Sequence, residues 1–196
     1  MAQRGQRIEN PVTGQTMIFL ETGENTSGEV FRMEGIFRPG GFAGVLHVHP
    51  FQEERFAVTQ GTAGFRVSSK QLQLGPGETI VVPAGRPHTF WNGGADEMRV
   101  VMEFRPALAA ATGRFYEVYF GLAQAGKAGK NGLPSIWQVA LQAEEFGDHA
   151  RLASPPWVVQ RAIFALLKPI ARLLGYRPFI PQEAAAPARQ EGRVRD

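Results

Sequence analysis

Short apolar and alternating runs recur through the first half of the chain, and turn-forming residues separate them. The separating segments include residues 39–41, 75–77 and 83–85, where glycine and proline favour tight reversals of the chain. Strands at this regular spacing, with no helical period between them, are typical of an antiparallel sandwich or barrel. Residues 1–16 are polar and turn-rich. The predicted strands are residues 17–20, 30–37, 44–48, 55–59, 64–67, 79–82, 88–91 and 99–104.

The pattern changes after Pro106, where helical periodicity replaces alternation. A first helix is predicted over 107–125, and a second runs from Pro134 to about residue 146. A third is predicted over 155–175, where Pro169 should introduce a kink. We therefore expect an all-β domain over 1–106, a helical extension over 107–180 that packs on it or forms a dimer interface, and a disordered tail over 181–196.

Length, composition and charge exclude several classes of protein. The chain has 196 residues, enough for one domain with a hydrophobic core. It has no cysteine, which excludes a disulfide scaffold, a zinc ribbon and a thiol nucleophile. The net charge of +3 is too small and too evenly spread to indicate a nucleic-acid partner. Neither a signal peptide nor an apolar run of membrane-spanning length is present, so we expect a cytoplasmic protein without a membrane partner.

Three of the four histidines lie close together in the sequence, and two of them are two residues apart. In a strand, His47 and His49 would point to the same face. A carboxylate follows, from Glu53 or Glu54, and His88 comes from a later predicted strand. Three imidazoles and one carboxylate suit a divalent transition metal ion, namely Fe, Mn, Ni, Co, Cu or Zn, better than they suit Mg or Ca.

Two motifs in this region resemble those of the cupin superfamily. Gly41, His47, His49, Glu54 and Gly61 match the spacing of the first cupin motif, and Gly77, Pro83, Gly85, His88 and Asn92 match the second. The resemblance covers residues 41–92 directly, and the strand pattern extends it to roughly 15–106. It implies a double-stranded β-helix, or jelly-roll barrel, with C-terminal α-helices outside it. It also implies that His47, His49, Glu54 and His88 hold one metal ion near the mouth of the barrel.

For several side chains near the motifs, the sequence allows more than one placement or role. Only one of Glu53 and Glu54 should reach the metal, because neighbouring strand residues face opposite sides; the spacing to Gly61 favours Glu54. Gln52 could support a ligand or be exposed, and exposure is favoured. His149 follows the second predicted helix and is expected at the surface. Four phenylalanines are expected in the core or beside the metal: Phe56, Phe65, Phe90 and Phe104.

Other charged residues leave alternatives open. Glu103 and Arg105 share one face of the last predicted strand and could form a cavity ion pair or an exposed one. Arg161, Lys168 and Arg172 share one side of the third predicted helix. Packing of this helix on the barrel or on a second subunit is favoured over a membrane-surface role.

The predicted set of metal ligands leads to two main functional hypotheses. The first is a metal-dependent enzyme acting on a small organic molecule, with a dioxygenase of the quercetinase-like sort as the preferred class by resemblance. Glu54 would be a ligand and could also act as a base. The second is a non-catalytic barrel that binds or senses a small molecule. A mainly structural metal is a weaker third possibility. Because cupins are often dimers, the resemblance also implies a homodimer.

Overall fold

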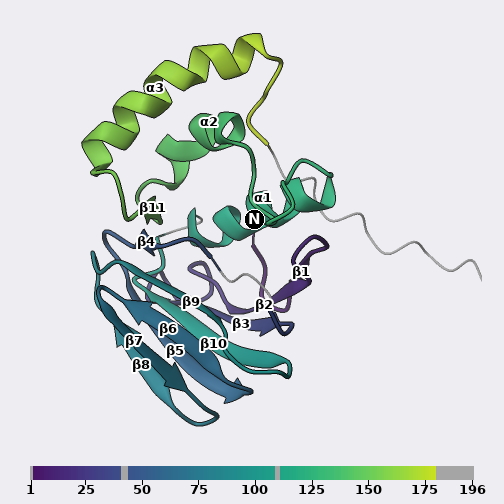
Figure 1. Cartoon of the computed structure of the whole chain (residues 1–196), viewed down its shortest axis with the longest axis vertical. Coiled ribbons are helices and arrows are strands. Elements are labelled where there is room, and N and C mark those ends of the chain that lie inside the picture. Colours follow the sequence, from purple (N-terminus) through teal and green to yellow (C-terminus); the bar gives the residue numbers. More distant parts are fainter. Residues whose placement is uncertain (1, 41–43, 109–110, 180–196) are drawn as a thin grey trace, which may run out of the picture.

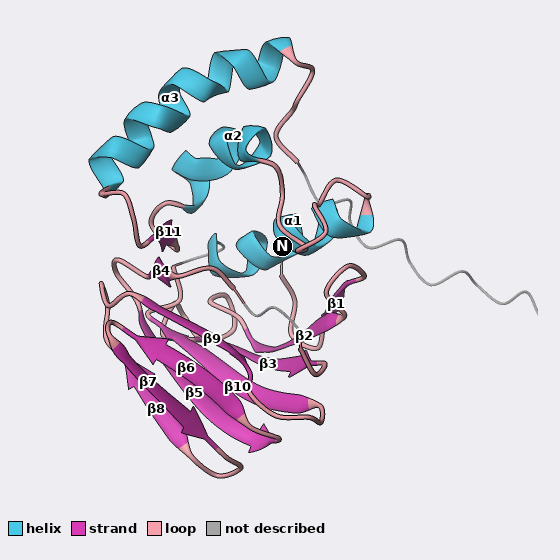
Figure 2. Ribbon diagram, viewed as in Figure 1, coloured by secondary structure: helices cyan, strands magenta, loops and turns pink. Residues whose placement is uncertain are grey.

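The computed structural model of the chain describes residues 2–40, 44–108 and 111–179, and within them two antiparallel sheets enclose a common core (Figures 1 and 2). Antiparallel pairing throughout confirms the predicted all-β core. The six-stranded sheet has the order β1 (Arg7–Asn10), β2 (Gln15–Glu21), β3 (Phe31–Phe37), β10 (Met98–Arg105), β5 (Glu53–Gln60) and β8 (Thr79–Val82). The five-stranded sheet has the order β11 (Arg151–Leu152), β4 (His47–Val48), β9 (His88–Asn92), β6 (Ala63–Val67) and β7 (Lys70–Leu74).

Alternation along the central strands directs one side chain in two into the core. In β10, every second residue from Met98 to Phe104 is buried, and the residues between them are partly exposed. The phenylalanines expected in the core are all buried there, at 0–6% exposure: Phe56, Phe65, Phe90 and Phe104. Glu103 and Arg105 lie on the outer face of β10 and pair with each other at 3.0 Å, so they form no cavity ion pair.

Three strands of the sheets were missed by the sequence prediction, and all three are edge strands. β1 lies within the segment read as turn-rich, and β7 has mostly exposed residues. An edge strand pairs on one side only and need not bury a full apolar face, so it lacks the alternation that reveals a central strand. A third, β11, is only two residues long and pairs with β4 after the chain has passed through two helices.

The three predicted helices are present: α1 (Ala111–Gln124), α2 (Ile136–Phe146) and α3 (Trp157–Leu173). The α2 helix begins later than predicted because the hydroxyl of Ser135 accepts from the backbone N–H of Gln138 and caps it. The α3 helix continues through Pro169, and the predicted kink stays a prediction. No helix in the described part is long and apolar enough to cross a membrane. Gly41 and the predicted tail lie outside the described residues.

The helices gather over one end of the sheets, with α1 against β1 and α3 outermost against α2 (Figure 2). Lys168 of α3 forms an ion pair at 2.5 Å with Glu144 of α2. Another side of α3 is uncharged and exposed. We call this row the α3 stripe; its members follow one another at alternating steps of four and three residues, the spacing of a helix that pairs with a second helix. They are Val159, Ile163, Leu166, Ile170 and Leu173.

Candidate metal centre

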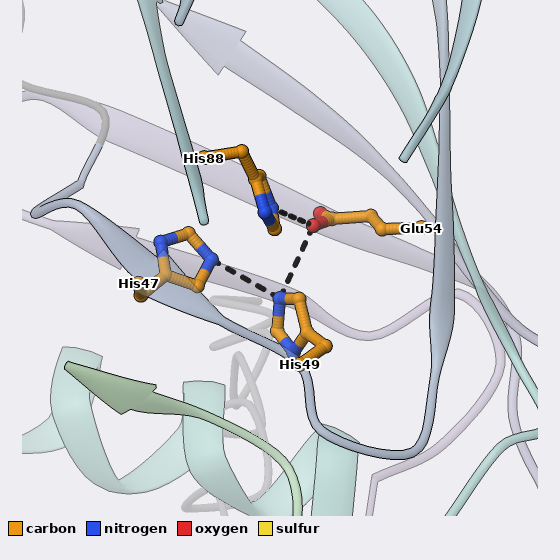
Figure 3. A group of neighbouring side chains, drawn as sticks. All are labelled: His47, His49, Glu54 and His88. Carbon is orange, nitrogen blue, oxygen red and sulfur yellow. Dashed lines mark hydrogen bonds and ion pairs between the residues drawn. The ribbon is translucent and has the colours of Figure 1, made fainter. Parts of the chain in front are cut away.

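The four predicted ligands come from both sheets and meet at the end of the barrel that the helices cover (Figures 1 and 3). His47 on β4 lies opposite His88 on β9 in the five-stranded sheet. His49 follows β4 directly, and its carbonyl accepts a hydrogen bond at 2.7 Å from the N–H of Gly85. Gly85 has a φ of 75°, a conformation that glycine adopts without strain, so the turn before β9 also fixes the position of His49. Glu54 reaches the group from β5 in the other sheet.

The ligand atoms of these residues converge closely. One nitrogen or oxygen from each lies within 4.8 Å of those of the other three. The Oε2 atom of Glu54 is 2.7 Å from Nε2 of His88 and 3.1 Å from Nε2 of His49. The Nε2 atoms of His47 and His49 are 3.1 Å apart (Figure 3). These four residues could therefore hold a metal ion.

The other ring nitrogen of each histidine shows that this donor set suits a cation. Each Nδ1 faces a backbone carbonyl oxygen, which can only accept, so each Nδ1 carries a proton and, when the ring is neutral, its Nε2 presents a lone pair. Two lone pairs facing each other repel unless a cation lies between them. Backbone or carboxylate acceptors behind the histidines are also the usual support of metal ligands. The acceptors are the carbonyl oxygens of Val45, His149 and Arg86, at 2.8, 2.5 and 2.9 Å from His47, His49 and His88.

The charge states of His47 and Glu54 also favour cation binding. Burial, with further contributions from His49 and His88, lowers the pKa of His47 to about 3. Burial alone would raise the pKa of Glu54, but the adjacent His49 and His88 rings hold it well below its usual range. For His88, burial lowers the pKa, but the hydrogen bond to Glu54, the charge of Glu54 and the carbonyl of Arg86 together raise it above its usual value, so this ring must lose a proton before it can bind a metal. A neutral imidazole and an ionised carboxylate are the forms in which these side chains bind metals.

Glu53 and Glu54 lie on opposite faces of β5, as strand alternation requires. The Glu54 side chain is 3% exposed and lies against the histidines. Glu53 is partly exposed and pairs with Arg55 at 2.6 Å on the outer face. The geometry therefore brings Glu54, and not Glu53, to the candidate centre.

Gln52 is not exposed, contrary to the favoured prediction. Its exposure is 0%, and its Nε2 donates to the carbonyl of Pro106 at 2.8 Å and to the hydroxyl of Thr112 on α1 at 3.1 Å. Alternation could have revealed this burial, since Gln52, Glu54 and Phe56 lie two positions apart along the chain and are all buried. Gln52 thus joins the barrel to the helical extension.

His149 was expected at the surface, and this prediction was wrong. The residue is 0% exposed, and its ring lies 4.8 Å from the ring of His49, measured between centroids. Nδ1 of His149 donates to Oε1 of Gln52 at 2.8 Å. Burial, with a further contribution from His49, holds the pKa of His149 well below its usual value. No local pattern signals this position, because it arises where the chain returns to pair β11 with β4.

A cavity of about 450 Å³ opens beside the candidate metal centre, a size typical of small-molecule sites. His47, His49 and Glu54 lie on its barrel side, and side chains from all three helices form the opposite walls. Tyr116 and Tyr119 of α1 line it, and sequence reasoning had not singled them out. Burial raises the pKa of Tyr119 to about 12 and, together with the charge of Glu54, raises that of Tyr116 well above its usual value. Both hydroxyls therefore stay protonated at neutral pH.

Comparison with known proteins now identifies the barrel. The family model described as Cupin domain matches residues 33–104, which include all four candidate ligands. This part of the chain is a cupin domain. The cupin resemblance read from the two motifs, and the double-stranded β-helix it implied, are confirmed. The helices at the C-terminal side lie outside the matched residues.

Individual relatives are more distant. A probable oxidoreductase, virH of Hypocrea virens, is 31% identical over 144 residues, which cover 68% of this chain and 64% of that protein. This chain therefore covers less than two thirds of the length of that curated relative. A sugar phosphate isomerase from the cupin superfamily of Silicibacter pomeroyi is 20% identical, with a TM-score of 0.45 over 51% of this chain and 70% of the other. A predicted oxalate decarboxylase of Thermotoga maritima is 21% identical, with a TM-score of 0.46 over 54% of this chain and 99% of the other. None of these names says what this cupin acts on.

Proposed function

We propose that this cupin is a metal-dependent oxidoreductase of the dioxygenase type that acts on a small organic molecule bound in the cavity. The observation that carries the proposal is the convergence of three imidazole lone pairs and one carboxylate at the wall of a largely apolar cavity. The similarity to a probable oxidoreductase supports the redox class. The alternative is a barrel that binds or senses a small molecule without converting it.

In this proposal, each group of residues around the cavity would have its own role. His47, His49, Glu54 and His88 would hold the ion, which when bound would supply Lewis acidity and, if redox-active, electron transfer. Glu54 is ionised and lies on the cavity wall, so it could accept a proton from an acidic group of a bound molecule, although its lowered pKa makes it a weak base. The hydroxyl of Tyr116 remains a neutral hydrogen-bond donor. Side chains of the three helices form part of the cavity wall, and exclusion of water by a bound molecule would strengthen each of these polar interactions.

Metal analysis is the first test. The protein, purified without a histidine tag, is compared by inductively coupled plasma mass spectrometry with a variant that carries His47→Ala and His88→Ala. We expect about one equivalent of Fe, Mn, Ni, Co, Cu or Zn in the wild type and its loss in the variant. A wild-type protein that takes up no metal, even after reconstitution, would refute the proposal. Zinc as the only metal that binds would remove the redox class.

Oxygen uptake then separates the enzyme from the binding module. The metal-loaded protein is screened in an oxygen electrode against small aromatic and hydroxylated compounds. Consumption of dioxygen in proportion to substrate, absent in the double variant, supports the dioxygenase. Saturable binding of a compound with no oxygen uptake and no product supports the non-catalytic alternative.

A further inference from the structure

Two residues that line the cavity carry three buried polar side-chain atoms that have no hydrogen-bond partner among the described residues. They are Nε2 and Oε1 of Gln142 on α2 and Nε2 of His149. Gln142 is 1% exposed and His149 is 0% exposed. Buried polar atoms are almost always paired, because leaving one unpaired destabilises the fold. Because these atoms belong to residues that line one cavity, a molecule that enters the cavity is a candidate partner for them.

The hydrogen bonds behind His149 fix what it can accept. Gln52 uses its Nε2 to donate to Pro106 and Thr112, so its Oε1 is left to accept from Nδ1 of His149 at 2.8 Å. The proton of the neutral imidazole is then on Nδ1, and Nε2 offers a lone pair. A partner at this atom must donate an O–H or N–H. His149 lines the same cavity as His47, His49 and Glu54, but it is not one of the four converging residues.

Gln142 imposes a second, different requirement. Its carboxamide offers one acceptor and two donor hydrogens, so a complementary partner presents a carbonyl beside an N–H or O–H. Aromatic side chains, including Phe115, Tyr119 and Phe146, form much of the remaining wall. Arg151 also lines the cavity, but its guanidinium donates to the carbonyl of Gly147 and pairs with Asp148 at 3.2 Å. The wall therefore favours a neutral and mostly apolar molecule.

We propose that Gln142 and His149 form a polar subsite for a neutral, largely aromatic ligand that donates a hydroxyl to Nε2 of His149 and pairs an amide-like edge with the Gln142 carboxamide. The subsite deepens the proposed function, on which it rests, by naming the class of molecule held beside the metal. It is built from the helical extension and the segment that follows α2, both outside the cupin motifs.

Two pairs of probes test the two contacts separately, by isothermal titration calorimetry on the metal-loaded protein. The first pair is 2-naphthol and 2-methoxynaphthalene, of which only 2-naphthol can donate to His149. The second is 2-quinolinone and N-methyl-2-quinolinone, of which only 2-quinolinone has a free lactam edge for Gln142. We expect the donor of each pair to bind about tenfold more tightly than its methylated partner, the effect of one buried hydrogen bond.

Three variants assign each preference to a residue. His149→Asn keeps a donor near Gln52 but removes the Nε2 acceptor, and should abolish only the naphthol preference. Gln142→Leu should abolish only the quinolinone preference. Gln138→Leu is the matched control, one turn earlier on α2; its amide donates to the carbonyl of Arg177 at 3.1 Å and does not line the cavity. It should leave both preferences intact.

Thermal denaturation gives an independent readout of the Gln142 side chain. Gln142→Leu should raise the melting temperature, because it removes unpaired buried atoms, whereas Gln138→Leu should lower it, because it breaks a hydrogen bond. Metal content is measured on every sample. If metal is retained and the probes bind without preference, or do not bind at all, the subsite is overturned and the metal proposal stands. Loss of metal from the wild type would instead overturn the proposed function.

Discussion

Gln52→Leu tests whether the helical extension and the barrel are joined through one buried side chain. Leucine has a similar volume, so the substitution mainly removes the hydrogen bonds of the amide. Gln52 makes three of them, to Pro106, Thr112 and His149, at 2.8, 3.1 and 2.8 Å. At about 1 kcal/mol for each buried hydrogen bond, the variant should lose about 3 kcal/mol of unfolding free energy. For a chain of this size, that loss corresponds to a fall in melting temperature of about 6–12 °C.

The same substitution should weaken metal binding without touching a ligand. Gln52 holds the ring of His149, whose carbonyl accepts from Nδ1 of His49 at 2.5 Å. Loosening this support should lower metal affinity by about tenfold, the lower end of the effect of groups that orient ligands. Chemical denaturation of the metal-free protein and competition with a chelator measure the two effects. Gln71→Leu, on the exposed side of β7, is the control and should change neither. A loss below about 1 kcal/mol, or unchanged metal affinity, would refute the reasoning.

Three further predictions concern other parts of the molecule. Glu54→Gln should lower metal affinity by more than about 100-fold in a chelator competition, whereas Glu53→Gln should not; equal losses would count against Glu54 as the ligand. Burial lowers the pKa of His149, so the folded protein keeps this ring neutral while the unfolded chain takes up a proton, and the unfolding free energy falls as the pH drops below about 6.5. Metal-free His149→Asn lacks this loss, so between pH 7 and 5 its unfolding free energy should rise relative to that of the wild type by up to about 1.4 kcal/mol per pH unit. Denaturation curves measure this difference, and a difference that does not change with pH would contradict the prediction. We also propose that the α3 stripe packs against the α3 stripe of a second copy, so light scattering should show a dimer. Leu166→Glu should disrupt this dimer, whereas Val81→Glu, at an exposed position of β8, should leave it intact. A monomeric wild type would exclude this interface.

The sequence allowed the barrel and the four converging side chains to be predicted for local reasons. Strand alternation placed His47 and His49 on one face and separated Glu54 from Glu53, and the structure shows both arrangements. The long-range link to His88 came from the resemblance to cupin motifs. Strand alternation also indicates that Gln52 faces inward, but Gln52 was predicted to be exposed because it is polar and lies beside a turn. Local pattern therefore shows which way a side chain points, and it does not show whether a later segment will cover it.

His149 shows what local pattern cannot supply. It lies 100 residues along the chain from His49, and its burial depends on how α1 and α2 pack and on the return of the chain as β11. The same applies to Gln142, whose unpaired amide has meaning only because a cavity lies beside it. The candidate metal centre is thus encoded in a compact stretch of strands, whereas the proposed ligand subsite is assembled by the extension. A chain that kept the motifs but changed these helices would be expected to bind the same kind of metal and a different molecule.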